Sequence, residues 1–576
     1  MKLAWRGRFA YFLLLMGFLG ITVQLLRVQV VRAPDLQEKA RQQAFHKVRV
    51  PAIRGAVLDR NGAPLAVSTP VKSVYAAPPE VATGRGDLER LARALDMEPR
   101  ALRERLERSS PFVYLRRQVP PSVAEAVQAL GINGIGTVQE YRRYYPAGEV
   151  AAHVVGFAGV DGIGLEGVEL AYDRTLSGTP GRRLVERDAL GRDMRTLRVE
   201  KPVRRGDDLR LSLDSRLQYV TYQALKETVA RYEAKAGMAV VVDPHTGEVL
   251  ALANVPSYNP NRRGGQGGAA KRRNRAITDA MEPGSILKPF TVAAALEEGQ
   301  VRPDTEVFCE NGLMRVGGHA IHDAHPMGEV PVQEVIQKSS NICAAKIALD
   351  QDNQQLWGHL RGFGFGLRPG TGFPGEASGV LRPPYQWNRF ERATIGFGHG
   401  MTASALQVAR AYAVLANGGV RLPLTLRRVG PDEVVPGKRV LGRETAEEMA
   451  EMLSLVVGPG GTGKRAALEG YGVAGKTGTA QKPEKGGYAE DKYLSAFAGF
   501  APVSNPSLVA VVMVDEPQGE HYGGKVAAPA FRRIIAQGLR LRQVPPRPSE
   551  EGGGPPPPLR QARGTGEPAA ASGSAS

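Results

Sequence analysis

The run Glu282-Pro283-Gly284-Ser285-Ile286-Leu287-Lys288 carries the most informative chemistry in this 576-residue chain. It places a hydroxyl at the start of a predicted helix and an amine three residues later, so both side chains share one helix face. The helix N-terminus supplies backbone N–H groups, and a neutral lysine beside the serine could take its proton. Taken alone, a Ser-x-x-Lys match is explained by chance as readily as by a catalytic site.

Two further motifs follow in order: Lys338-Ser339-Ser340-Asn341, and then Gly475-Lys476-Thr477-Gly478-Thr479. Each has a simple structural interpretation, a helix cap for the first and a strand end for the second. These interpretations do not explain the order Ser-x-x-Lys, Ser-x-Asn, Lys-Thr-Gly, which is the signature of one superfamily. The chain therefore resembles the penicillin-binding proteins and serine β-lactamases.

Further runs resemble class B penicillin-binding proteins, which join an N-terminal pedestal to a C-terminal transpeptidase. They are RGAVLDRNGAPLA (54–66), residues 143–181, RAITDAMEPGSILKP, QKSSN, IGFGHGMTASALQVARAYAVLANGG and AGKTGTAQK. Within the family, GVDGIGLEGVELAYDRTLSG, DKYLSAFAGFAP and HYGG (521–524) are most similar to the division-specific FtsI type. The resemblance implies a peptidoglycan D,D-transpeptidase that cross-links stem peptides through an acyl-serine in septal wall synthesis, and that β-lactams inhibit covalently.

The resemblance also implies a role for each motif residue. Ser285 would be the acylated nucleophile and Lys288 its base. Ser339 would relay a proton, Asn341 would hold a substrate amide, and Lys476 would supply positive charge. The implied substrate-binding residues are Thr477, Gly478 and Thr479, and the oxyanion hole would use the N–H groups of Ser285 and Thr479. Arg54, Asp59 and His153 are expected to be structural, and no cofactor or metal is expected.

The expected fold has a single N-terminal transmembrane helix, a β-rich α+β pedestal, and an α/β transpeptidase domain of the penicillin-binding protein and serine β-lactamase type. The predicted boundaries are a cytoplasmic tail at 1–8, an anchor at 9–29, the pedestal at 42–205, the transpeptidase domain at 207–542 and a disordered tail at 544–576. In the transpeptidase domain, strands at both ends with helices between them predict one sheet built from distant segments. Helices are predicted at 214–232, 285–298, 332–349, 403–415 and 529–541, and strands at 238–242, 248–253, 472–476, 495–500 and 508–515.

The anchor prediction rests on 9–26, an uncharged apolar run of about 18 residues that crosses most of a hydrocarbon core roughly 30 Å thick. A cleaved signal peptide is the alternative, but the run is longer than a usual signal core and no small-residue cleavage site follows it. We expect the inner (plasma) membrane, with a cytoplasmic N-terminus and an extracytoplasmic catalytic domain. Basic residues flank both ends of the apolar run, so the difference in Lys and Arg content between its two sides is small and defines the orientation only weakly.

The amino-acid composition excludes several classes of protein. The chain has 75 Lys and Arg against 58 Asp and Glu, and hydrophobic residues make up 42% of it, so it is neither disordered nor a multi-span transporter. The basic residues form no dense block with interleaved aromatics, so we expect no nucleic-acid binding. Two cysteines exclude a disulfide framework, and Cys309 and Cys343 could be bridged or could be two buried thiols. The Gly-rich basic run 261–274 is predicted to be a mobile loop beside the site.

The expected partners are peptidoglycan stem peptides, β-lactam antibiotics and the membrane. No transglycosylase-like domain precedes the pedestal, so glycan polymerisation is expected to come from a partner. For the FtsI type, the resemblance implies the membrane glycosyltransferase FtsW, together with other division proteins. Three alternatives stay open: an elongation- or sporulation-specific transpeptidase, a D,D-carboxypeptidase or β-lactamase that uses water as acceptor, and a non-catalytic division scaffold.

Overall fold

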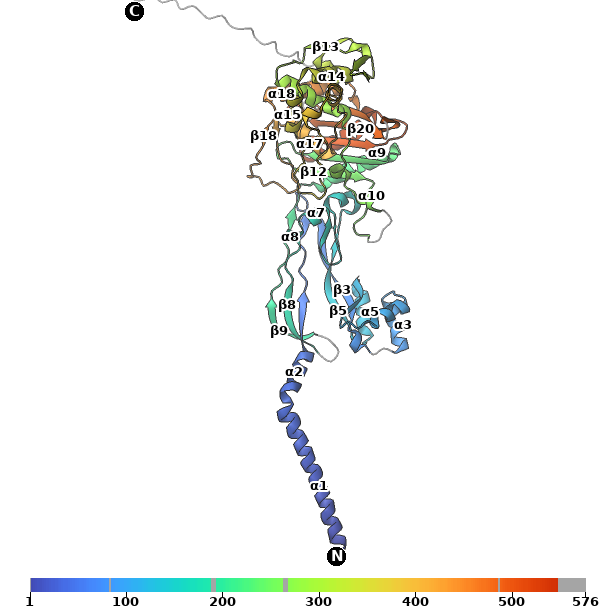
Figure 1. Ribbon diagram of the computed structural model, residues 1–576, viewed down its shortest axis with the longest axis vertical. Coiled ribbons are helices and arrows are strands. Elements are labelled where there is room, and N and C mark those ends of the chain that lie inside the picture. The colour runs from blue at the N-terminus through green and yellow to red at the C-terminus, as the bar shows by residue number, and fades with distance from the viewer. Residues whose placement is uncertain (1, 82–83, 188–192, 263–267, 485–486, 547–576) are drawn as a thin grey trace, which may run out of the picture.

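Figure 1 shows the computed structural model, in which the chain forms three parts along one long axis. Helix α1 lies at one end, a β-rich pedestal follows, and a large α/β domain lies at the other end (Figure 1). The structure describes residues 2–81, 84–187, 193–262, 268–484 and 487–546. The predicted fold class is confirmed. The predicted disordered tail from residue 547 onward, and residues 263–267 of the glycine-rich run, lie outside the described residues.

The N-terminal segment is a long apolar helix. Helix α1 (Lys2–Leu26) continues through the π-helical turn η1 (Arg27–Val31) to α2 (Ala33–Ala44). Within it, Trp5–Val31 has a mean hydropathy of 2.1, and none of it is buried against the rest of the chain. At about 1.5 Å per residue this stretch exceeds a hydrocarbon core roughly 30 Å thick. The chain therefore has one N-terminal helix that could span a membrane.

The pedestal is built from two sheets, which are antiparallel except for one parallel pair of strands in the second sheet. In the first, β1 (Phe45–Val50) pairs with β8 (Gly181–Arg187), and β8 pairs with β9 (Asp193–Lys201). In the second, the strand order is β10 (Leu209–Arg210), β2 (Val57–Leu58), β3 (Pro64–Ala76) and β4 (Val113–Val119), with β5 (Ile135–Tyr144) also paired to β3. Helices α3 (Arg85–Ala94), α4 (Pro99–Leu106) and α5 (Pro121–Ala129) contribute to a small core against these strands.

A turn that contains Asn61 and Gly62 joins β2 to β3. Gly62 has φ +92°, a left-handed conformation that glycine adopts without steric cost. The Asp59 carboxylate accepts hydrogen bonds from the N–H groups of Asn61 and Ala63, both at 2.8 Å, and from the Ser215 hydroxyl at 2.7 Å. Asp59 is therefore structural, as expected, and it connects the pedestal to the first helix of the α/β domain.

A buried ion network holds the pedestal together. The Glu169 carboxylate, which is fully buried, accepts from Nε of Arg54 at 2.5 Å and from Nε of Arg143 at 2.7 Å. Arg54 also donates to Asp173 at 2.6 Å. These contacts tie β5 to α7 (Gly167–Ala171) and α8 (Asp173–Leu176). The network gives Arg54 the structural role that the sequence led us to expect.

The α/β domain has a five-stranded antiparallel sheet with the order β12-β11-β21-β20-β19. Its strands are β11 (Ala236–Val242), β12 (Val249–Val255), β19 (Ala474–Glu484), β20 (Gly487–Ala501) and β21 (Leu508–Asp515). Every residue of β11, β12 and β21 is buried, because helices cover both faces. The sheet therefore combines the first and last parts of the domain, as predicted.

Successive residues along β11 and along β21 face different cores. Val240 packs into the core that contains α12 (Lys288–Glu297) and α17 (Ala405–Ala416), and Val241 packs into the core that contains α9 (Ser215–Arg231) and α20 (Ala528–Leu541). This follows from the two-residue period of a strand. The sheet is thus fixed from both sides, and β19 remains as one of its two edge strands.

Three local features differ from the sequence prediction. The helix predicted at 332–349 is two helices, α13 (Val332–Lys338) and α14 (Asn341–Asp350), separated at Ser339. Strands β19 and β20 extend beyond the predicted 472–476 and 495–500 as a long hairpin. Part of the run predicted to be a mobile loop, 261–274, forms α10 (Gly268–Arg272), and α11 (Arg275–Thr278) follows directly after that run.

The remaining elements are short or lie around this framework. They are η2 (Pro78–Glu80), η3 (Gly148–Val150), α6 (Ala152–Val155), β6 (Phe157–Ala158), β7 (Gly164–Glu166), η4 (Gly284–Leu287), β13 (Glu306–Phe308), η5 (Glu310–Gly312), β14 (Leu313–Val316), β15 (His319–His322), β16 (Glu329–Pro331), α15 (Asn353–Phe363), η6 (Pro384–Gln386), α16 (Arg389–Ile395), β17 (Val420–Arg421), β18 (Lys438–Arg439), α18 (Arg443–Val457), η7 (Lys464–Ala466) and α19 (Gly523–Val526).

Replacing Glu169 by alanine should destabilise the pedestal. The change leaves the guanidinium groups of Arg54 and Arg143 without their shared buried carboxylate, and breaking a buried pair in this way costs about 3–5 kcal/mol. Thermal unfolding of the full chain in detergent measures the effect as an earlier first transition. Glu186→Ala removes the exposed pair with Arg195 and is the control, since such pairs contribute about 0–1 kcal/mol. Equal unfolding midpoints for the two variants would contradict the structural role of the network.

Candidate active site

Ser285 lies in the short 3-10 helix η4, which leads directly into α12. The turn begins at Gly284, whose φ of +58° favours glycine, and a Cβ there would lie 3.0 Å from the Cβ of Ala480 on β19. Ile286 and Leu287 of the turn are buried. The Tyr412 hydroxyl of α17 donates to the carbonyl of Ile286 at 3.0 Å. The turn is therefore held between the core helix α17 and the edge strand β19.

Gly478 lets β19 approach this turn closely. A Cβ at Gly478 would lie 2.9 Å from Cγ2 of Ile286 and 3.3 Å from the carbonyl oxygen of Pro283. These distances are shorter than ordinary contacts, so a larger residue would push β19 away from Ser285. The glycine of the Lys-Thr-Gly motif, which the resemblance assigned to substrate binding, thus has a steric role in bringing the first and third motifs together.

The second motif sits where the chain breaks between α13 and α14. Ser339 adopts φ 68° and ψ 42°, a left-handed conformation that costs a residue with a Cβ on the order of 1 kcal/mol. Ser340 then caps α14 by accepting from the N–H of Cys343 at 3.0 Å. The break brings the Ser339 hydroxyl to 3.1 Å from the amine of Lys288. The two serines of the motif therefore have different tasks, and only Ser339 contacts Lys288.

Lys288 is fully buried at the first turn of α12. Its amine donates to the carbonyl of Ser339 at 2.6 Å, to the Ser339 hydroxyl, and to Oδ1 of Asn341 at 2.8 Å. Burial lowers the pKa of Lys288 to about 7, although the charge of Asp323 acts in the opposite direction. A substantial fraction of the amine is thus neutral near pH 7, which suits a general base.

Lys476 on β19 is also fully buried, and its amine donates to the carbonyl of Thr477 at 3.2 Å. Burial, followed by repulsion from Lys288, holds the pKa of Lys476 well below its usual range. Repulsion between the two amines disfavours the state in which both are protonated. The charge expected on Lys476 is therefore sensitive to any negative group that enters the site.

The two threonines of the third motif are already oriented by other residues. Oγ1 of Thr477 lies 2.8 Å from Oγ1 of Thr462. Oγ1 of Thr479 accepts from the N–H of Gly523 at 3.0 Å, which leaves its own hydrogen free to donate. The hydroxyl of Thr479 is thus arranged as a donor at the edge strand.

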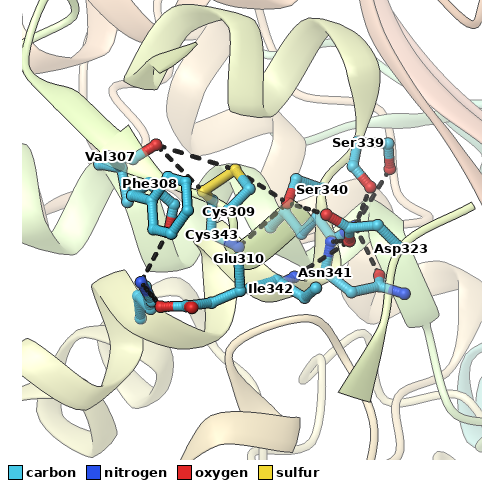
Figure 2. Close-up of a disulfide and its surroundings, with 12 residues drawn as sticks. Val307, Phe308, Cys309, Glu310, Asp323, Ser339, Ser340, Asn341, Ile342 and Cys343 are labelled. Atoms are coloured by element: carbon cyan, nitrogen blue, oxygen red, sulfur yellow. Dashed lines mark hydrogen bonds and ion pairs between the residues drawn. A yellow bond between two sulfur atoms is a disulfide. The ribbon is translucent and has the colours of Figure 1, made fainter. Parts of the chain in front are cut away.

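Asp323 is part of the site although it lies outside the three motifs. Its carboxylate accepts from the N–H of Asn341 at 2.5 Å, from the N–H of Ile342 at 3.1 Å and from the Ser340 hydroxyl at 2.6 Å (Figure 2). A carboxylate at the N-terminus of α14 satisfies helix N–H groups and the helix dipole. Asp323 follows β15 and belongs to no recognised motif, so only the tertiary fold reveals that it holds Asn341 in place.

Cys309 and Cys343 form a disulfide, which resolves the alternative that the sequence left open. Figure 2 shows it on the side of Ser340 away from Ser339, and both cysteines are fully buried beside Val335. The two residues are 34 positions apart, so closing this loop stabilises the fold by about 3–4 kcal/mol in the chain-entropy model. The bond ties the end of β13 to α14, the helix that begins at Asn341.

Three further side chains meet beside the nucleophile turn. The Tyr488 hydroxyl from the β19–β20 hairpin donates to Glu282 at 3.0 Å, and the N–H of Gly400 donates to Glu282 at 2.9 Å. Nδ1 of His399 lies 3.2 Å from the Tyr488 hydroxyl and 3.6 Å from Glu282. Glu282 lies three residues before Ser285 but outside the Ser-x-x-Lys motif, and sequence spacing relates none of these three residues to the others.

His153, expected to be structural, is buried, and its Nε2 lies 2.8 Å from the carbonyl of Lys271. Burial lowers the pKa of His153 to about 4, so the ring is neutral. Among the described residues, no cluster of three or more His, Cys, Asp or Glu side chains has an arrangement that could hold a metal ion.

Comparisons with known proteins match both domains. Residues 237–536 match the penicillin-binding protein transpeptidase domain, and residues 49–211 match the penicillin-binding protein dimerisation domain. The Escherichia coli K12 protein named peptidoglycan D,D-transpeptidase FtsI is 38% identical over 577 aligned residues, which cover 98% of this chain and 96% of that protein. The Neisseria meningitidis protein named probable peptidoglycan D,D-transpeptidase PenA is 39% identical, with 94% of each chain covered.

Solved structures show the same architecture. Penicillin-binding protein 3 from Mycobacterium tuberculosis, complexed with aztreonam, is 29% identical and covers 87% of this chain and 98% of its own, with a TM-score of 0.67. The transpeptidase domain of Burkholderia pseudomallei penicillin-binding protein 3 is 44% identical and covers 58% of this chain and 97% of its own, with a TM-score of 0.54. The chain therefore belongs to the class B penicillin-binding proteins and is similar to those of the FtsI type.

Proposed function

We propose that this protein is a D,D-transpeptidase that cross-links peptidoglycan stem peptides and carries the acyl group on Ser285. The observation that supports this most directly is the buried amine of Lys288, which contacts Ser339 and Asn341 and has a pKa near 7. Such an amine can accept a proton at neutral pH. Relatives over nearly the full length of the chain bear the name of this activity.

In the first step, neutral Lys288 takes the proton of the Ser285 hydroxyl. The serine oxygen attacks the carbonyl of the amide bond that joins the two D-alanines. The oxyanion is stabilised by the N–H groups of Ser285 and Thr479, and removing one such donor typically costs about 3–4 kcal/mol. The proton then passes from Lys288 through the hydroxyl of Ser339 to the departing D-alanine. The products are an acyl-serine ester and free D-alanine.

In the second step, an amine of a neighbouring stem attacks the ester. The amine loses a proton by the reverse route, and Ser285 regains its hydroxyl hydrogen. A β-lactam would follow the first step only, since its leaving group stays attached and blocks the acceptor. Covalent inhibition by β-lactams is part of the same proposal.

Substrate binding is proposed along the exposed edge of β19. The hydroxyls of Thr477 and Thr479 and the positive charge of Lys476 would bind the terminal carboxylate, which in turn favours protonated Lys476. Asn341 uses Oδ1 for Lys288 and donates from Nδ2 to the carbonyl of His322 at 2.9 Å. Its second Nδ2 hydrogen is the one that would hold a substrate amide.

We also propose a septal role, an inner-membrane location and a cytoplasmic N-terminus. The FtsI-type similarity supports the septal role, and the apolar helix Trp5–Val31 supports membrane anchoring. The disulfide supports an extracytoplasmic catalytic domain, because disulfides persist in oxidising compartments. FtsW and other division proteins are the proposed partners, and the proposed domain boundaries remain 42–205 for the pedestal and 207–542 for the transpeptidase.

Ser285→Ala should abolish covalent labelling by fluorescent penicillin, because the variant has no hydroxyl to form the ester. Labelling is measured on the full chain in detergent after denaturing electrophoresis. Ser378→Ala, which changes an exposed serine outside the site, should label like the parent protein. Labelling that survives in Ser285→Ala would remove the proposed nucleophile, and rapid release of the label by the parent protein would favour a β-lactamase.

The rate of acylation by a soluble β-lactam should rise with pH through a midpoint near 7. The pKa of Lys288 is lowered to about 7, and the reactive form is the neutral amine, so below the midpoint the rate should fall about tenfold per pH unit. Asp323→Asn removes the charge that favours protonated Lys288, so its midpoint should move to lower pH. Stopped-flow rates between pH 5.5 and 9, chosen as roughly two units around the midpoint, give the profiles. A flat profile would argue against Lys288 as the base.

A fluorescent fusion of the full chain should concentrate at the division site, and depletion of the protein should give filaments. This outcome follows from the septal role, because unlinked septal wall stops division while side-wall growth continues. The same cells complemented with Ser285→Ala provide the test of a scaffold function. Spherical cells after depletion would assign the protein to elongation, and normal division with Ser285→Ala would favour the scaffold.

A further inference from the structure

We propose that a positively charged cavity of the α/β domain binds a multivalent oxyanion, a ligand with two or more negative charges on phosphate or carboxylate groups. The cavity lies between the segment that follows α15, the middle of α17 and the β17–β18 connection. Both α15 and β17 contact α17, and β17 pairs with β18. The volume of the cavity is about 500 Å³, which is typical of sites for small molecules. None of the three motifs contributes to it, so the proposal goes beyond the transpeptidase function.

The first support is the charge of the residues that line the cavity. Four of them are basic, and none is an aspartate or a glutamate. The four basic residues are Arg368, Arg410, Arg421 and Lys438. Among the described residues, none of the four takes part in an ion pair. Cations gathered in this way repel one another, and the cavity therefore attracts an anion that relieves the repulsion.

The second support is the burial of Arg410, whose charge meets only neutral groups. Arg410 is 5% exposed. Its Nη1 donates to the carbonyls of Arg368 and Pro369 at 3.1 and 3.3 Å, and its Nη2 donates to those of Gly364 and Leu367 at 2.5 and 3.1 Å. Its Nε is buried and has no hydrogen-bond partner. Because buried charges are normally paired, this guanidinium lacks an anion.

Glu376 does not supply that anion. Its carboxylate accepts hydrogen bonds from the N–H groups of Gly370 at 2.9 Å and Thr371 at 2.7 Å, and no ion pair joins it to Arg410 in the described part of the chain. Burial, followed by repulsion from Arg421, lowers the pKa of Arg410 to about 10, although the charge of Glu376 acts in the opposite direction. Arg410 thus stays protonated at neutral pH, and its charge stays uncompensated.

The third support is that Arg421 repeats the pattern at the other side of the cavity lining. Its Nη1 donates to the carbonyls of Gly362 at 2.6 Å and Arg361 at 3.2 Å, which are also neutral. Burial, followed by repulsion from Arg361, lowers the pKa of Arg421. A guanidinium group binds phosphate and carboxylate through two parallel hydrogen bonds. The lining residues therefore favour an oxyanion over other anions.

The cavity is separate from the catalytic site. Arg410 and Tyr412 are two residues apart on α17, so their side chains point in directions that differ by about 200° around the helix axis. The Tyr412 hydroxyl contacts the carbonyl of Ile286 in the nucleophile turn. The cavity that Arg410 lines is therefore on the side of α17 away from that turn.

The test measures the binding of pyrophosphate to the full chain in a non-ionic detergent by isothermal titration calorimetry. The ionic strength is about 0.15 M, at which exposed charges are screened beyond about 8 Å. The parent protein should bind pyrophosphate saturably. Arg368→Gln combined with Lys438→Gln removes two exposed charges of the cavity and leaves the buried Arg410 in place, so the fold is kept. This double variant should bind at least about tenfold more weakly, as expected for lost charge-assisted hydrogen bonds.

Arg315→Gln combined with Arg389→Gln is the matched control. It removes the same charge from two exposed residues elsewhere in the α/β domain. The control should bind pyrophosphate like the parent protein. Equal weakening in the two double variants would overturn the proposal, because binding would then follow the net charge of the chain. The absence of saturable binding to the parent protein would overturn it as well.

Two further ligands define the chemistry of the anion. Citrate carries its charges on carboxylates, and acetate carries a single charge. Tighter binding of pyrophosphate than of citrate assigns the site to phosphate groups, and the reverse order assigns it to carboxylates. Acetate should bind at least about tenfold more weakly than the better of the two, because it meets several cations with one charge. Equal binding of acetate would contradict a site for multivalent anions.

A titration after saturation with penicillin separates the cavity from the catalytic site, where a substrate carboxylate is proposed to bind. Pyrophosphate binding should persist in the acylated protein. Loss of binding on acylation would place the anion beside Lys476 and overturn the proposal. The comparison of the two double variants needs no acylation, so it still tests the cavity if penicillin does not label the protein and the proposed function fails.

Discussion

The α/β domain depends on the burial of two lysine amines, Lys288 and Lys476, where the nucleophile turn meets the edge strand. Removing an ammonium group from water is costly unless acceptors replace the lost hydration. For Lys288 these acceptors come from Ser339 and Asn341, and for Lys476 from the carbonyl of Thr477. None of them carries a full negative charge. The pKa values of both amines are therefore lowered from their usual range, and this is what makes the pair chemically useful.

The acceptors of Lys288 exist only because the chain breaks at Ser339. A continuous helix would keep the carbonyl of that residue inside the helical hydrogen-bond pattern and could not point it at the amine. The break needs the left-handed conformation of Ser339, the cap formed by Asp323, and the disulfide that ties Cys343 to Cys309. On the opposite side of the site, Gly478 allows β19 to lie close to the nucleophile turn. Lys476 of β19 therefore lies in the same site as Lys288. The fold thus positions one amine from a helix and one from a strand.

Much of this arrangement could be predicted from the sequence. The order of the three motifs indicated that Ser285, Ser339 and Lys476 lie on elements that meet, and the distribution of strands predicted a sheet from distant segments. The break at Ser339 could not be predicted, because 332–349 has a continuous helical pattern and only tertiary contacts stabilise the left-handed serine. Two cysteines without a spacing rule left the disulfide open. Asp323 and Tyr488 reach the site from loops and hairpins whose direction the sequence pattern does not define.

The pedestal and the α/β domain are joined by a shared hydrophobic core. Val57, Leu65 and Tyr145 of the pedestal belong to one continuous hydrophobic core with Met238 and Phe290 of the α/β domain. Strand β10 adds a parallel pairing to β2, and the Asp59 carboxylate bonds to Ser215 at the start of α9. Separating the two domains would expose a shared core, so the junction is stiff rather than hinged. A contact that tilts the pedestal must therefore also move β11 and α12, and α12 is the helix that carries Lys288.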